Sequence, residues 1–300
     1  MTLLISFDDN KLTITRKAIL TVTIFTIAGN IAEFFIPDLF SSLDSGYNIT
    51  GRSAGLYLNA NTSGEAIILG MILSYSMLDK KYRTFFLVAS LLGVISTFSR
   101  TAIASWFVVV AILSYGKVID KKNIAMVLGS LVLVGIFIVP FVIHYIETNL
   151  EAGTVTNLMT RLNFFSSKSQ GLDGSQQQRL EVARAALENF ANNPLIGAGI
   201  AHTSHWEFPI STHNIYLKLM AEYGIIGVFL YPLLILSTVW KAKNEAVAIA
   251  RAFSIYLLII GFTTHNSLDE HHLLIAFAVM ANLTYHSKTT NSNSPLSSNY

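Results

Sequence analysis

Apolar residues along this chain gather in long blocks that are separated by polar stretches. Blocks of about 15 to 23 apolar residues have the length that a helix needs to cross a hydrocarbon layer of about 30 Å. They predict eight membrane-spanning helices, at residues 18–36, 63–78, 84–98, 101–115, 124–145, 214–238, 252–264 and 272–286. Only Ser99 and Arg100 separate the third from the fourth, which predicts a helical hairpin or two half-helices there. The pattern indicates an all-α, polytopic integral membrane protein.

Two polar segments on one side of the predicted membrane are too long to be simple connections. Residues 37–62 are rich in Gly, Asn and Ser, which is a loop composition. Residues 146–213 form a soluble insert, in which a capping box at Ser175 predicts an amphipathic helix from about 176 to 190. The chain thus divides into N-terminal helices (1–145), the large outer insert (146–213), C-terminal helices (214–286) and a disordered tail (287–300).

The composition agrees with a membrane protein. Of the 300 residues, 52% are hydrophobic and only 13% are charged, and the mean hydropathy is +0.51; soluble domains are about 25% charged. The chain has no cysteine, which excludes disulfides, thiolate zinc sites and cysteine nucleophiles. The net charge of +2 is too small to indicate a nucleic-acid partner. Any chemistry therefore uses histidine, arginine, carboxylates and hydroxyls.

Basic residues orient the predicted helices. Most of the 20 Lys and Arg residues fall on one side of the eight-helix arrangement, which the positive-inside rule makes the cytoplasmic side, together with both termini. The outer side carries Arg52, Arg100, Arg161, Lys168, Arg179, Arg184 and Lys218. Topology does not explain these seven cations, so an anionic ligand or an acidic partner is expected for some of them.

Three of the outer arginines, Arg52, Arg100 and Arg179, are candidates for an anion site. Arg184 has acidic residues three positions before and four after it on the predicted helix, so an ion pair accounts for it. Arg179 has none at these spacings and is the better ligand candidate. Arg52 lies among glycines whose backbone amides can approach a phosphate, with pairing to a loop aspartate as an equal alternative. Arg100 stands between two apolar helices, where an arginine is costly unless it is paired or hydrated, and a functional role is favoured over a plain salt bridge.

His213 and Asn214 stand where the insert meets an apolar helix. An imidazole at such an interface has an ordinary pKa of about 6.5, which suits proton transfer at neutral pH. Gly224 and Gly227 follow on the same predicted helix and are expected to present a flat face to a neighbouring helix or a lipid chain. Glu222 is expected to orient His213 or an arginine. For each residue alone, packing or interfacial placement is the plainer interpretation, and the combination is what indicates a site.

A second polar cluster, at residues 265–272, lies between the last two predicted helices. On a helix, His265, Asp269 and His272 would share a face that can bind a divalent ion. The same residues would also be found in a polar turn between two helices, and a loop or an acceptor-binding role is the favoured interpretation. We therefore predict no metal site.

Several stretches resemble one bacterial family. His213-Asn214, followed by nine residues, Gly224, two residues and Gly227, resembles the signature of O-antigen ligases. Other family segments are similar to residues 50–61, with a Gly-Arg and a downstream Asn, residues 97–101, with a Ser-Arg, and residues 179–199, with an arginine helix and a Pro-Leu-x-Gly-x-Gly turn. The family also contains O-antigen polymerases and protein O-oligosaccharyltransferases.

This resemblance implies a metal-independent, inverting glycosyltransferase that needs no cofactor. Such enzymes move a glycan from undecaprenyl pyrophosphate to an acceptor hydroxyl, such as that of lipid A-core, on the periplasmic face of the bacterial inner membrane. Arg52, Arg100 and Arg179 would hold the pyrophosphate, whose negative charge grows as the sugar–oxygen bond breaks. His213 would remove the acceptor proton. Full-length relatives have more spans, so about four N-terminal helices are expected to be missing from this chain.

Three other functions remain open on the same residues. A polymerase that extends the glycan on its lipid carrier is the nearest, because it belongs to the same family. A transporter or exporter would use Glu33, Glu65 and Glu222 as a proton path, although the chain has no internal repeat and its unexplained cations lie outside the membrane. A non-catalytic membrane scaffold is the third.

Overall fold

The computed structural model describes residues 8–36, 39–40, 52–57, 59–133, 174–208 and 211–289. Every regular element within these ranges is helical, which confirms the all-α prediction for this part of the chain. The chain forms two compact units. We call residues 13–169 the N-terminal unit, and residues 170–300 together with 1–12 the C-terminal unit.

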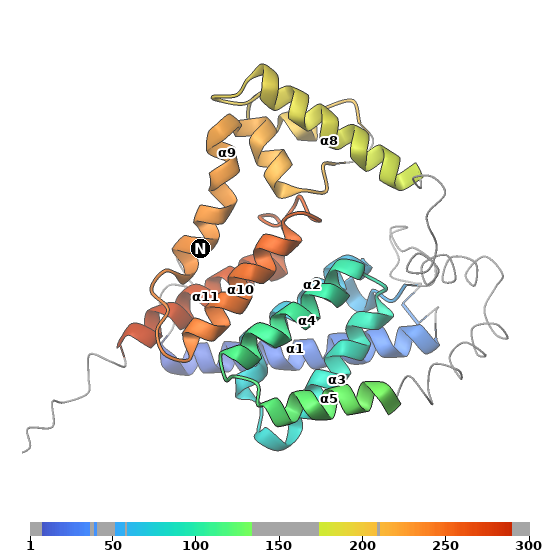
Figure 1. Cartoon of the computed structure of the whole chain (residues 1–300), viewed down its shortest axis with the longest axis vertical. Coiled ribbons are helices and arrows are strands. Elements are labelled where there is room, and N and C mark those ends of the chain that lie inside the picture. Colours follow the sequence, from blue (N-terminus) through green and yellow to red (C-terminus); the bar gives the residue numbers. More distant parts are fainter. Residues whose placement is uncertain are drawn as a thin grey trace, which may run out of the picture. The chain divides into compact units, whose positions relative to one another are not determined.

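The N-terminal unit is built around one buried helix. Its elements are α1 (Asp9–Phe35), η3 (Gly55–Tyr57), α2 (Ala60–Ser74), η4 (Tyr75–Met77), α3 (Lys80–Ser96), α4 (Arg100–Tyr115) and α5 (Lys121–Leu133). Most residues of α2 are buried, and α2 packs against α3 and α4 (Figure 1). Trp106 of α4 is fully buried, and its Nε1 donates to the hydroxyl of Ser90 on α3 at 3.0 Å. Burial of these large apolar side chains is what stabilises the unit.

The C-terminal unit carries the predicted histidine site. Its elements are α8 (Gly174–Asn192), η6 (His202–Ser204), α9 (Ile215–Val239), α10 (Ala246–Ile260) and α11 (His271–Thr289). Helices α9, α10 and α11 pack on one another, and α8 packs on α9 (Figure 1). The core is formed by Phe253, Tyr256 and Leu257 of α10 with Met280 of α11, all fully buried. The hydroxyl of Tyr231 on α9 donates to the carbonyl of Leu257 at 3.3 Å.

The helices follow the predicted spans closely. Each predicted span overlaps a helix, and the third and fourth form the hairpin α3–α4. The amphipathic helix expected at 176–190 is α8, extended by two residues at each end. Among the described residues, Asn10–Phe35 and Ile215–Val239 are long and apolar enough to cross a membrane, and Arg100–Tyr115 and Ala246–Ile260 are shorter apolar helices.

Several predictions concern residues outside the described ranges. They are the second half of the span at 124–145, most of the outer loop 37–62, the insert up to residue 173 with Arg161 and Lys168, and the tail from residue 290.

Helix α9 bends sharply at the first signature glycine. Gly224 has φ 64° and ψ −144°, which is not a helical conformation. Residues 215–223 therefore form a first limb and residues 225–239 a second limb (Figure 1). The second limb has more exposed residues than the first. Such backbone angles are accessible almost only to glycine. The span predicted at 214–238 is thus helical on both sides of a break.

Candidate functional site

The signature histidine lies in the tight loop that leads into α9. His213 has a φ of 46°, in the left-handed region where histidine, asparagine and aspartate are enriched over other residues with a side chain. Asn214 is the N-cap of α9, and its side-chain oxygen accepts a hydrogen bond from the N–H of Leu217 at 3.1 Å. The N–H of Ile215 donates to the carbonyl of Gly261, at the end of α10. Asn214 thus supports the site by starting the helix directly after His213.

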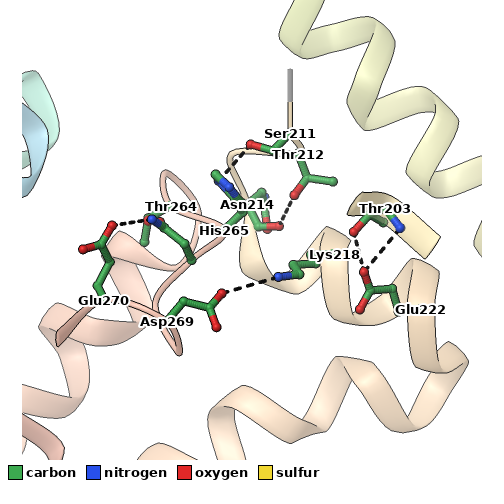
Figure 2. Close-up of polar contacts among 11 residues, drawn as sticks. Thr203, Ser211, Thr212, Asn214, Lys218, Glu222, Thr264, His265, Asp269 and Glu270 are labelled. Atoms are coloured by element: carbon green, nitrogen blue, oxygen red, sulfur yellow. Dashed lines mark hydrogen bonds and ion pairs between the residues drawn. The ribbon is translucent and has the colours of Figure 1, made fainter. Parts of the chain in front are cut away.

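A second imidazole packs against the first. The rings of His213 and His265 meet edge to face, with centroids 5.4 Å apart and an angle of 87° between their planes. The hydroxyl of Ser211 lies 3.0 Å from Nδ1 of His265, so the second ring is tied to the loop that carries the first (Figure 2). We did not foresee this pair from the sequence, where the hint is that His-Asn occurs both at 213–214 and at 265–266.

The surroundings favour the neutral form of both imidazoles. Burial lowers the pKa of His213 below its ordinary value, and the positive charge of Arg179 lowers it further. Burial, His213 and Lys218 lower the pKa of His265 to about 4, against the opposing effect of Asp269. At neutral pH each ring therefore has a nitrogen with a free lone pair, which is what a general base requires.

The segment 265–270 is a turn rather than part of a helix, since α11 begins after it. Asp269 forms an ion pair with Lys218 of α9, with 3.8 Å between the charged atoms (Figure 2). The metal-binding face considered for His265, Asp269 and His272 does not form, because the backbone turns between these residues. In the described part of the chain, no group of three or more His, Asp or Glu side chains is placed to hold a metal ion.

The signature glycines lie where α9 meets the turn that follows α8. Backbone hydrogen bonds of 2.8 to 3.1 Å join residues 194–199 to residues 221–225. The N–H groups of Ala198 and Gly199 donate to the carbonyls of Ala221 and Glu222, respectively. In the opposite direction, the N–H of Ile225 donates to the carbonyl of Pro194. These bonds satisfy backbone groups that the break in α9 would otherwise leave without partners. The Pro-Leu-x-Gly-x-Gly turn and the Gly-x-x-Gly pair therefore form one joint structure.

The glycines permit this close approach because they have no side chain. A Cβ atom at Gly224 would lie 2.6 Å from the carbonyl carbon of Leu195, and one at Gly227 would overlap the carbonyl oxygen of Leu219. A Cβ atom at Gly197 would likewise overlap the backbone of Glu222. The close neighbour of Gly224 is therefore the backbone of the turn after α8, and the close neighbour of Gly227 is the backbone of the first limb of α9.

Glu222 has a structural role that differs from the predicted one. Its buried carboxylate accepts hydrogen bonds from the N–H of Thr203, at 3.3 Å, and from the hydroxyl of the same residue (Figure 2). It thus holds η6 against α9, and we find no contact in which it orients His213 or an arginine among the described residues. In the N-terminal unit, Glu33 similarly accepts from the backbone N–H groups of Ala54 and Gly55, at 2.7 Å each. These contacts give no support to a proton path.

Helix α8 supplies the arginine of the histidine site. Arg179 is exposed on α8 and lies close enough to His213 to lower its pKa. It forms no ion pair with any residue in the described ranges, as its helix spacing predicted. Arg184 is also exposed and, within the same ranges, does not make the ion pair expected with Glu181 or Glu188. The C-terminal unit therefore brings together His213 and Arg179 of the predicted site.

The other two arginines lie in the N-terminal unit. Arg52 donates from Nε to the carbonyl of Thr97, at 2.8 Å, and from Nη2 to the side-chain oxygen of Asn61, at 2.7 Å. The family-like segments 50–61 and 97–101 therefore lie side by side. Arg100 is exposed at the first position of α4, directly after the hairpin turn. This unit thus carries Arg52 and Arg100 on neighbouring segments.

Comparison with known protein families found a match to this chain. A family model described as O-antigen ligase matches residues 85–231, a range that includes Arg100, Arg179, His213 and both signature glycines. No curated protein matches the chain. The family is associated with membranes, and its members are glycosyltransferase-like enzymes with lipid-linked glycan substrates. Residues 85–231 of the chain therefore match the O-antigen ligase family.

Proposed function

We propose that this protein is a ligase-type glycosyltransferase that moves a glycan from undecaprenyl pyrophosphate to an acceptor hydroxyl. The observation that carries the proposal is the half-buried His213, neutral at neutral pH and close to the exposed cation of Arg179, within the O-antigen ligase domain. A neutral base beside a fixed positive charge suits a reaction that removes a proton while an anionic group leaves. Lipid A-core is the acceptor that we propose.

The transfer is a single displacement. The acceptor oxygen attacks the anomeric carbon of the glycan while His213 takes the proton of that hydroxyl. The bond from the anomeric carbon to the pyrophosphate oxygen breaks, and undecaprenyl pyrophosphate leaves with the electron pair. Attack from the face opposite the leaving group inverts the anomeric carbon. Because pyrophosphate is a good leaving group, the residues proposed here need no metal ion.

Arg179 is proposed to bind the leaving pyrophosphate. The guanidinium fork matches phosphate oxygens in pairs, and its charge stabilises the transition state more than the ground state because the phosphate charge grows during the reaction. Arg52 and Arg100 are proposed to contribute to pyrophosphate binding as well, on the basis of the family-like segments that carry them.

The protein is proposed to lie in the bacterial inner membrane, with the histidine loop on the periplasmic face. Support comes from the apolar helices and from the concentration of basic residues on the opposite side of the eight-helix arrangement. The second limb of α9 is followed at once by Trp240 and Lys241, a pair of residue types typical of a cytoplasmic membrane boundary.

Complementation of a bacterium that lacks its own ligase tests the function. Wild-type chain should restore the lipopolysaccharide ladder on a gel, and His213→Ala should not, at equal membrane abundance. His205→Ala is the matched control, because His205 lies in the same unit, is exposed, and makes its one polar side-chain contact among the described residues with the nearby Ala201 carbonyl, at 3.1 Å. A second pair compares Arg179→Gln, expected to weaken the ladder, with Arg184→Gln, one and a half helical turns further along α8 and expected to leave it intact.

Each outcome of this assay decides something. A full ladder from His213→Ala would remove His213 from the role of base. A wild-type chain that gives no ladder, but lengthens lipid-linked glycans in a strain without its own polymerase, would make the protein a polymerase of the same family. A chain that does neither at normal membrane abundance would refute glycan transfer.

A further inference from the structure

The turn after α8 exposes an unusual amount of apolar surface. Within residues 194–200, the exposed fractions of Leu195, Ile196 and Ile200 are 72%, 78% and 80%. Three aliphatic side chains this exposed within seven residues form a patch rather than isolated surface positions, and contiguous apolar patches mark contact with a protein or a membrane. We call residues 194–200 the apolar turn.

The apolar turn is fixed to the bend of α9. Three backbone hydrogen bonds join it to residues 221–225, and one of them runs from the N–H of Ile225 to the carbonyl of Pro194 at 2.8 Å. Ile225 is the first residue of the second limb, so the exposed side chains of the turn lie directly beyond the outer end of that limb. The turn is therefore hydrogen-bonded both to the end of the first limb and to the start of the second.

The second limb continues the same apolar surface. Ile226 is 60% exposed and Phe229 is 55% exposed, and Ile225 and Leu233 are exposed as well. Apolar residues that a core leaves uncovered along a whole helix are those that lipid chains cover. The patch on the turn is thus an extension of a surface with lipid-facing character.

The length of the second limb determines how deep the turn lies. Residues 225–239 rise about 22 Å at about 1.5 Å per residue, which is shorter than a hydrocarbon layer of about 30 Å. Trp240 and Lys241 mark the inner boundary. If the inner end is at that boundary, the outer end of the limb is still within the hydrocarbon of the outer leaflet. The apolar turn is then at the depth where acyl chains meet headgroups.

We infer that the apolar turn inserts Leu195, Ile196 and Ile200 among the acyl chains of the outer leaflet and so anchors the histidine site to the membrane surface. The inference rests on the proposed membrane crossing by the second limb of α9. Its functional consequence is that the height of His213 is fixed relative to the plane in which a lipid-linked pyrophosphate lies, because the turn and the first limb of α9 are hydrogen-bonded to each other. The partner is the lipid bilayer itself.

Site-directed labelling tests this directly, because the chain has no cysteine and a single introduced thiol is labelled uniquely. Three variants, Ile196→Cys, Phe229→Cys and Glu188→Cys, are spin-labelled and placed in vesicles of phosphatidylethanolamine and phosphatidylglycerol. Collision with oxygen, which dissolves in lipid, is compared with collision with a water-soluble nickel chelate. We expect the label at position 196 to follow the label at 229, with oxygen collisions several-fold above nickel collisions. The label at exposed Glu188 of α8 should show the reverse ratio.

The control at position 229 separates two failures. If the label at 196 is in water while the label at 229 is in lipid, the inference is wrong and the membrane crossing of α9 stands. If the label at 229 is also in water, both the crossing and the inference fail. Ile200→Cys provides a second reading from the same turn and is expected to agree with position 196.

Discussion

An added methyl group at a glycine can impose two costs, backbone strain and atomic overlap. Substitutions at four glycines of this protein allow the two costs to be measured separately. In the described part of the chain, an added Cβ at Gly129 of α5 meets no atom within 4 Å apart from chain neighbours and its own helix backbone, and Gly129 has no positive φ; Gly199 has equally open space but a φ of 108°. Gly227 is helical, but its Cβ would overlap a backbone carbonyl oxygen, and Gly224 combines a positive φ with close backbone contact. Alanine at Gly129 therefore imposes neither cost, and alanine at Gly199 imposes backbone strain alone. Alanine at Gly227 imposes atomic overlap alone, and alanine at Gly224 imposes both.

The expected magnitudes follow from these geometries. Gly129→Ala removes a flexible residue from a helix and should be neutral or stabilise the protein by up to about 1 kcal/mol. Gly199→Ala should cost about 1 to 3 kcal/mol, because alanine is strained at that φ. Gly227→Ala should cost about 3 kcal/mol or more, since a backbone atom cannot rotate away as a side chain can. Gly224→Ala should cost the most, near the sum of the two terms.

The assay is thermal unfolding of the detergent-solubilised protein, followed by the loss of the monodisperse gel-filtration peak after heating. The midpoints should rank Gly129→Ala at or above wild type, then Gly199→Ala, Gly227→Ala and Gly224→Ala in descending order. Equal midpoints for Gly224→Ala and Gly129→Ala would refute the hydrogen-bonded junction between α9 and the apolar turn. A loss at Gly199 as large as that at Gly224 would show that strain alone, without overlap, dominates.

Three further predictions concern the histidine loop. The rate of transfer should persist below pH 6.5 because the pKa of His213 is lowered, and Arg179→Gln should move the acid limb of the normalised pH–rate profile to higher pH; an unmoved limb would contradict their coupling. Because His265 titrates at about 4 in the folded protein and at about 6.5 when unfolded, the unfolded state binds more protons between these values. The unfolding midpoint should therefore fall as pH falls through this window, and His265→Asn should reduce that decline. Asn214→Ala should cost about 1 kcal/mol in unfolding free energy through loss of the helix cap, whereas Asn214→Asp, which keeps the acceptor oxygen, should cost much less.

Helix positions could be predicted from the sequence because they depend on local apolar runs and caps. The helix expected at 176–190 is α8, and the third and fourth spans do form a hairpin, whose turn is residues 97–99. An asparagine directly before an apolar run is typical of a helix start, and the Asn214 side chain does accept from the N–H of Leu217, three residues ahead. These features need only a few neighbouring residues to be specified.

What the sequence did not reveal depends on contacts between distant segments. Spacing alone put Gly224 and Gly227 on one helix, whereas the approach of residues 194–199 requires the chain to bend at Gly224. Similarly, the contact of His213 with His265 arises from the packing of α9 against α10 and α11, and no periodicity reports it. Such pairings are set by tertiary structure and are visible only once the helices are placed.

The positive φ of His213 also limits which residues can stand at that position. Left-handed backbone disfavours alanine and β-branched residues and admits glycine, asparagine, aspartate and histidine most readily. Among these four, histidine alone carries a group whose ordinary pKa lies close to neutrality. The backbone conformation of the loop thus restricts the residue types that fit at position 213, independently of any catalytic requirement. A homologue that has given up transfer could keep this loop with asparagine or glycine in place of the histidine, and the identity of that one residue would separate active from inactive members that share the same fold.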